Sequence, residues 1–253
     1  MKNITLTILT IILSSNIFFG QKSDLAGFES FLGKEKAAAL NELNRSFENF
    51  LKTNYPKIDN ENNRIYKFLD GYKNWSVLEK EWIIDYANAK ETLDQFEKSG
   101  LRIEFWKYGY ETYKPEYQID SFILPQEDTS NLDTLSLKDL YVDDIEEEII
   151  PITNEDYDPE LEEKLQRQRD SSQSFNHEGQ FIYGLAKYGT NDSLVAGYID
   201  AKYAAGDISP SLIVGGLTVH NLDLSVPLRK RIILMEFYYH FLQWSIENKK
   251  TTR

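Results

Sequence analysis

The sequence contains no cysteine, and this absence excludes several kinds of chemistry at once. Disulfide bonds, thiolate metal sites and a thiol nucleophile all need that residue. Histidine is scarce as well, with only three in the chain. A histidine-rich metal site would require folding to bring together residues from three separate predicted elements, namely His177, His220 and His240. We therefore expect a fold that is stabilised by side-chain packing alone.

The common catalytic and nucleotide-binding motifs are also missing. The chain has no Gly-x-Ser-x-Gly elbow, no glycine-rich phosphate loop ending in Lys-Ser/Thr and no dinucleotide-binding glycine fingerprint. His177-Glu178 begins like a zinc-protease motif, but Phe181 stands where the second histidine must be. These absences favour a protein without catalysis.

Acidic residues outnumber basic residues, and the excess is concentrated in one segment. The chain has 41 acidic and 28 basic residues, for a formal net charge of −13. Residues 116–163 alone hold 17 acidic residues and one basic residue, so the remainder is nearly neutral. Such a segment repels nucleic acids and anionic lipid, which argues against partners of either kind. Its prolines and low hydrophobicity predict that residues 115–173 form an acidic linker or insertion that is partly mobile.

The acidic segment also holds the weak candidates for metal binding. Residues 156–160 alternate acids as a calcium loop does, but Leu161 replaces the required glycine and Arg167 the final glutamate, which excludes a helix–loop–helix site. Loose Ca²⁺ binding remains as an alternative to a solvated run of charge. Its candidate ligands are Asp143, Asp144, Glu146, Asp156 and Asp158. No other cofactor is expected.

Only one long hydrophobic run is present, and it lies at the start of the chain. The run Ile4–Phe19 follows Lys2 and ends at Gly20. It is shorter than the roughly 20 apolar residues of a membrane-spanning helix and carries several polar residues. Residues 1–20 therefore predict a signal peptide that is cleaved after Gly20, with an uncleaved anchor as the alternative.

The residues around this cleavage point carry the one resemblance in the chain. Phe18-Phe19-Gly20-Gln21 resembles the exit of signal peptides in exported proteins of Bacteroidetes-type bacteria. The resemblance covers the leader alone and implies nothing about activity. The cleaved leader itself, together with the absence of a cysteine that could carry a lipid, predicts an exported protein, periplasmic or secreted, without a stable membrane anchor. The mature part resembles no family of known function.

Helical periodicity dominates the N-terminal region, residues 21–114. One apolar stripe recurs at three- and four-residue spacing through Leu40, Leu43, Phe47, Phe50 and Leu51. A second helix is expected to end at Gly71. Ser76 and Glu79 form a capping box, from which a long helix is predicted to carry Trp82 and Phe96 on its inner face.

The C-terminal region, residues 174–253, is predicted to be helical too. Asn191-Asp192 caps one helix, and Ser209-Pro210 opens a short one that should end at Gly215-Gly216. The last helix runs from about Pro227 to Asn248 and is apolar nearly all round, so it should be the buried centre of its bundle. The predicted fold class is all-α, mainly a helical bundle, with a short strand pair near residues 108–122.

Two clusters are candidates for function, each with a structural alternative. Glu236 and His240 lie four apart on the last helix and form a weak polar pair, but their helical line also carries other polar residues and is typical of a water-facing stripe. The aromatic residues between Trp106 and Tyr117 suit either stacking on sugars or core packing. The favoured interpretations are a water-facing stripe for the Glu236/His240 pair and packing for the aromatic residues.

These observations favour an exported, soluble helical protein that binds a protein or glycan partner in the envelope or medium, without catalysis. The alternative is a carboxylate-based hydrolase that acts on an extracellular or envelope substrate such as a glycan. Two carboxyl groups facing each other in a deep pocket beside Trp82 or Trp106 would favour the hydrolase. A largest pocket without convergent titratable groups would not.

Overall fold

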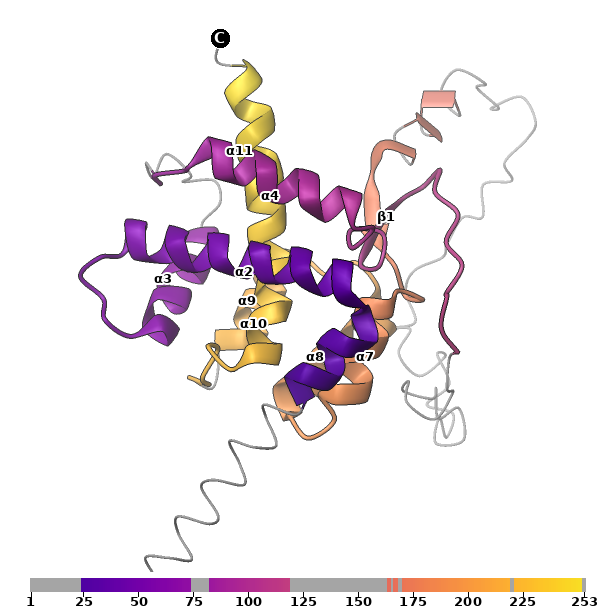
Figure 1. The fold of residues 1–253 in the computed structure, drawn as a ribbon, viewed down its shortest axis with the longest axis horizontal. Helices are drawn as coiled ribbons and strands as arrows, with labels where there is room; N and C mark the ends of the chain where they lie inside the picture. Colours follow the sequence, from indigo (N-terminus) through magenta and orange to yellow (C-terminus); the bar gives the residue numbers. More distant parts are fainter. Residues whose placement is uncertain are drawn as a thin grey trace, which may run out of the picture.

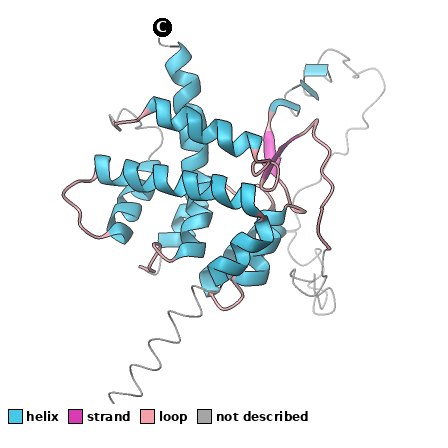
Figure 2. Ribbon diagram, viewed as in Figure 1, coloured by secondary structure: helices cyan, strands magenta, loops and turns pink. Residues whose placement is uncertain are grey.

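The protein is mainly helical, as the sequence predicts (Figures 1 and 2). The structure, a computed structural model, describes residues 24–73, 82–118, 163–164, 166–167, 170–218 and 221–251. After a helix over residues 24–32, the elements are α2 (Lys34–Asn54), α3 (Glu61–Lys73), α4 (Tyr86–Lys98), β1 (Trp106–Tyr108), β2 (Gln173–Phe175), α7 (Gln180–Tyr188), α8 (Ser193–Ala205), α9 (Pro210–Thr218), α10 (Pro227–Ile233), η3 (Leu234–Tyr238) and α11 (Tyr239–Thr251). None of the described helices combines the length and the apolar composition needed to cross a bilayer.

The centre of the fold is the last helix, which α10, η3 and α11 form without a break. Every residue from Leu228 to Tyr239 is buried except Arg229, which confirms the predicted buried centre. One turn of it, η3, is a π-helix, a local widening that often occurs at functional sites. In Figure 1, α2 and α4 lie side by side across this helix.

The N-terminal helices bury the predicted stripe on α2. Leu40, Leu43 and Phe47 are fully buried, and Phe47 and Phe50 both pack against Phe68 of α3. Tyr238 of η3 also contacts Phe47 and Phe50, with ring centroids 4.8 and 5.5 Å away. The two helical regions predicted from the sequence therefore contribute to one hydrophobic core.

Two predicted boundaries in this half were wrong. Gly71 does not end α3, which continues to Lys73, and a Cβ built on Gly71 would lie 2.7 Å from the Trp82 ring. Close packing, not a turn, explains this glycine. Residues 82–85 are not helical, because Asp85 caps α4 by accepting a hydrogen bond from the backbone N–H of Asn88. The predicted capping box at Ser76 and Glu79 lies outside the described residues.

In the C-terminal half the Asp192 cap is confirmed, because its carboxylate accepts from the backbone N–H groups of Leu194 and Val195. The predicted stop at Gly215-Gly216 was wrong. Helix α9 continues through both glycines to Thr218, whose hydroxyl donates to the carbonyl of Val214. The two glycines lie inside the helix, where neither meets a neighbouring atom at the Cβ position.

The strands form a single antiparallel pair among the described residues. Trp106 pairs with Phe175, Lys107 with Ser174, and Tyr108 with Gln173. The sequence predicts a strand pair near residues 108–122, but Tyr108 is the only one of the described residues 108–118 that lies in a strand. The partner comes instead from beyond the acidic segment, so the ribbon joins the two helical regions.

Candidate functional site

A pocket with a volume of about 550 Å³ lies between α8 and α9. Its lining residues share one property, the absence of any formal charge. They are Ser193, Leu194, Gly197, Tyr198, Ala201, Ile208, Leu212, Ile213, Gly216, Leu217 and Leu222. Leu212 is 69% exposed at this site, whereas Ile213 and Leu217 are buried. The pocket therefore offers an apolar surface that the other described residues leave uncovered.

Two glycines help to keep this space open. Gly197 of α8 and Gly216 of α9 line the pocket, and a Cβ at either position would meet no atom within 4 Å. Glycine inside a helix costs about 1 kcal/mol relative to alanine. Gly197 and Gly216 therefore each make their helix less stable, and they stand at positions where a larger side chain would enter the pocket.

The wall of the pocket continues into a buried polar cluster through Tyr198. The Tyr198 hydroxyl donates to the carboxylate of Glu236, which is 3% exposed. Lys202, one turn after Tyr198 on α8, has its Nζ 3.1 Å from Glu236 Oε1 and is fully buried. Burial raises the pKa of Glu236, while Lys202 and Tyr198 oppose that shift. The Glu236 carboxylate is thus engaged on the core side of α8.

Aromatic rings surround the lysine of this cluster. Lys202 Nζ lies 4.4 Å from the ring centre of Phe175 and 4.8 Å from that of Trp106. Both rings belong to the β1–β2 ribbon. Cation–π contacts of this kind help to offset the loss of hydration at a buried ammonium.

The predicted water-facing stripe through Glu236 and His240 was wrong. Glu236 is buried, and His240 contacts the main chain of Glu236 instead of its carboxylate, with Nδ1 3.3 Å from the carbonyl oxygen. The other imidazole nitrogen lies 3.3 Å from the amide oxygen of Gln173 in β2. The polar groups of this helix therefore serve contacts inside the protein.

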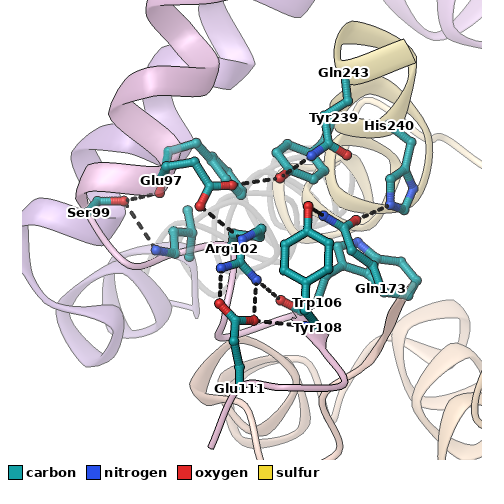
Figure 3. A network of polar contacts seen from close by, with 12 residues as sticks. Glu97, Ser99, Arg102, Trp106, Tyr108, Glu111, Gln173, Tyr239, His240 and Gln243 are labelled. Carbon is teal, nitrogen blue, oxygen red and sulfur yellow. Dashed lines mark hydrogen bonds and ion pairs between the residues drawn. The ribbon is translucent and has the colours of Figure 1, made fainter. Parts of the chain in front are cut away.

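Arg102 centres a second polar network, which ties the ribbon to α4 and α11 (Figure 3). Its guanidinium donates to Glu97, to Glu111 and to the carbonyl oxygen of Trp106. Glu97 also accepts from the hydroxyl of Tyr239. Arg102 is 8% exposed, and its contacts hold the turn before β1 in place.

The aromatic residues between Trp106 and Tyr117 differ in their exposure to solvent. Trp106 is buried at 6% exposure, and the Tyr113 hydroxyl donates to Glu104. Tyr110 is 67% exposed and stacks parallel to Tyr108, with ring centroids 5.5 Å apart. Packing accounts for Trp106, and Tyr110 presents an exposed ring.

The weak metal candidates lie outside the described residues, namely Asp143, Asp144, Glu146, Asp156 and Asp158, and so does His220. Over the residues that the structure does describe, no group of three or more potential metal ligands converges. The carboxylate hypothesis finds no support at the α8/α9 pocket either, because no acidic residue lines it.

The cluster of Tyr198, Lys202 and Glu236 is not among the sites that the sequence predicts. One signal was available, because Tyr198 and Lys202 are four residues apart and share a helix face with Val195 and Ile199 at neighbouring positions. A lysine on a predicted inner face indicates a buried partner. Nothing in the sequence identifies Glu236, 34 residues further on, as that partner.

His240 predicts a pH dependence of stability. Burial lowers the pKa of His240 to about 4, with a further lowering from Lys202 and an opposing effect of Asp207. In the unfolded chain the pKa is about 6.5, so the unfolded state binds more protons between these values and stability falls as pH falls through them. Relative to pH 7, we expect this group to remove about 2 kcal/mol by pH 4.5.

Denaturant unfolding at a series of pH values measures this effect. His240→Gln should show a smaller loss between pH 7 and pH 4.5 than the wild type, while the contribution of the other groups remains. Equal losses in the two proteins would contradict the assignment to His240.

Comparison of the chain with family models, with curated proteins and with solved structures finds no match.

Proposed function

We propose that this protein is an exported, non-catalytic binding protein that takes an apolar small molecule, or the apolar part of one, into the α8/α9 pocket. The observation that carries the proposal is the uncharged lining of a pocket of about 550 Å³. Binding pockets for small molecules usually measure about 300–1,000 Å³ and are mostly apolar. Burial of ligand surface there would contribute about 25 cal/mol per Å².

The buried cluster beneath the pocket supports binding over catalysis. Tyr198 and Lys202 both engage the carboxylate of Glu236, and the only one of these groups in the pocket lining is Tyr198. A general acid or base must reach the proton that it transfers. The Glu236 carboxylate instead holds Tyr198 and Lys202, and therefore helps to orient α8, which forms one wall of the pocket.

Filling the pocket tests this proposal. A leucine at Gly197 would extend into the open space, so Gly197→Leu should weaken binding of the apolar fluorophore N-phenyl-1-naphthylamine by at least about tenfold. The melting temperature should stay the same or rise, because leucine is the better helix former by about 0.8 kcal/mol. Fluorescence titration of wild type and variant measures the change.

Gly215→Leu is the matched control. Gly215 is also helical with open space around its Cβ position, but it does not line the pocket, so its replacement should leave probe binding unchanged. If the wild type does not bind the probe, or if the Gly197 and Gly215 variants bind it equally well, this pocket is not the binding site.

Export is the second part of the proposal, and it is supported by the apolar run Ile4–Phe19 and by Gly20 after it. Expression of the full chain in a Bacteroidetes host should give a protein in the periplasm or medium that begins at Gln21. Edman sequencing of that protein is the check, and an intact leader on a cytoplasmic protein would contradict export.

A further inference from the structure

A second pocket, with a volume of about 250 Å³, lies between α2 and the beginning of α4. These two helices pack against each other at the front of the molecule in Figure 1. The residues that line the pocket come from α2, from residues 83–85, from α4 and from the central helix behind. They are Ser46, Asn49, Phe50, Thr53, Ile83, Ile84, Asp85, Asn88, Ala89, Tyr238 and Leu242.

Two buried hydroxyl groups lie in this pocket. The Ser46 hydroxyl lies 2.9 Å from Asn88 Oδ1, to which it donates, and 3.0 Å from the hydroxyl of Tyr238. Ser46 is 5% exposed and Tyr238 is 2% exposed. The contact from Ser46 orients the side-chain amide of Asn88 through its oxygen. The amide nitrogen, Nδ2, donates no hydrogen bond within the part of the chain that the structure describes.

Two further polar side chains are exposed on the α2 side. Asn49 and Thr53 are four residues apart and so share a helix face. Their side chains make no hydrogen bond to any of the described residues, although both line the pocket. Both side chains can therefore bind a ligand without loss of a contact to the described residues.

The chemistry of the lining identifies the class of ligand. The only carboxylate that lines the pocket is that of Asp85, which already caps α4 with one oxygen, and the other polar side chains of the lining are neutral amides and hydroxyls. Amide and hydroxyl groups form the same kinds of hydrogen bond as the hydroxyl groups of a sugar, which both donate and accept. Phe50, Ile84 and Leu242 supply an apolar wall for the carbon face of such a ring.

We propose that this pocket binds a small neutral molecule with several hydroxyl groups, of the size of a single sugar ring. The site is separate from the α8/α9 pocket, and the proposal does not depend on the function proposed for that pocket. Asn49, Thr53 and the Asp85 carboxylate hold the exposed edge of the ring, and the Asn88 amide binds a hydroxyl group nearer the buried side.

Saturation-transfer NMR with the full-length protein tests the proposal. The probes are glucose, galactose and N-acetylglucosamine at millimolar concentration, with choline as a cationic comparison. At least one sugar should show transfer, and Asn49→Ala/Thr53→Val should weaken its binding by at least about tenfold, as expected when two hydrogen bonds to a ligand are lost. Because neither side chain has a partner among the described residues, the melting temperature should not change.

Asn63→Ala provides the matched control, since Asn63 is an exposed asparagine on the neighbouring helix α3 and does not line the pocket. Its sugar binding should equal that of the wild type. The proposal is overturned if none of the three sugars shows transfer, if only choline does, or if the double variant binds the sugar as well as Asn63→Ala does.

Discussion

Replacement of Lys202 by methionine should lower the free energy of unfolding by about 3–5 kcal/mol, because it leaves the Glu236 carboxylate buried without its cation. Lys202 is fully buried and Glu236 is 3% exposed, so water cannot replace the lost partner without rearrangement of the core. Urea unfolding of wild type and variant measures the difference. The loss should be larger at pH 8 than at pH 5, because at the lower pH the carboxyl group can take up a proton.

Two further variants make this result specific. Lys202→Met/Glu236→Leu removes both charges and should recover most of the lost stability, since a buried ion pair can be replaced by apolar residues with little net effect. Arg167→Met breaks the exposed pair with Glu163, whose side chains are 74% and 65% exposed, and should change stability by less than about 1 kcal/mol. A Lys202→Met protein as stable as Arg167→Met would show that the buried pair contributes little.

Gly179→Ala is expected to destabilise the fold by about 3 kcal/mol, at the upper end of the usual effect of overpacking. A Cβ at this position would lie 1.9 Å from the backbone carbonyl oxygen of Glu104 and 2.6 Å from its carbon. The φ angle of Gly179 is −70°, which any residue adopts, so the effect comes from the close approach of two backbones. Thermal and urea unfolding measure it.

This contact lies where the N-terminal and C-terminal regions meet. The backbone N–H of Gln180 donates to the Glu104 carboxylate at 2.8 Å, and that of Asn176 donates to the carbonyl of Phe105 at 2.8 Å. Gly215→Ala is the control, because its Cβ meets open space and the change should stabilise α9 by about 0.5–1 kcal/mol. Equal stability of the Gly179 and Gly215 variants would contradict the argument.

The helices could be predicted because their periodicity is local. The stripe on α2 and the nearly continuous apolar surface of the last helix need no knowledge of the rest of the chain. The errors at Gly71 and at Gly215-Gly216 have another cause. Glycine was interpreted as a helix stop, whereas at Gly71 the cause is the Trp82 ring, which only the tertiary fold places there.

The sites were harder to predict because they, too, depend on contacts that only the tertiary fold creates. A glutamate on a helix is usually exposed, and the burial of Glu236 depends on a lysine and a tyrosine from another helix. The α8/α9 pocket likewise depends on how two helices diverge, which no spacing in either sequence reveals. Asp192 was predicted correctly because a helix cap is formed within three residues.

The pairing of Trp106 with Phe175 also determines how the chain tolerates change in length. Because Tyr108 and Gln173 are paired, the chain between the two strands begins and ends at neighbouring positions on the helical body. Loop closure depends on length only logarithmically, and each halving changes the free energy by only about 0.6 kcal/mol. The two strands can therefore stay paired at a similar entropic cost of closure over a wide range of chain lengths between Tyr108 and Gln173.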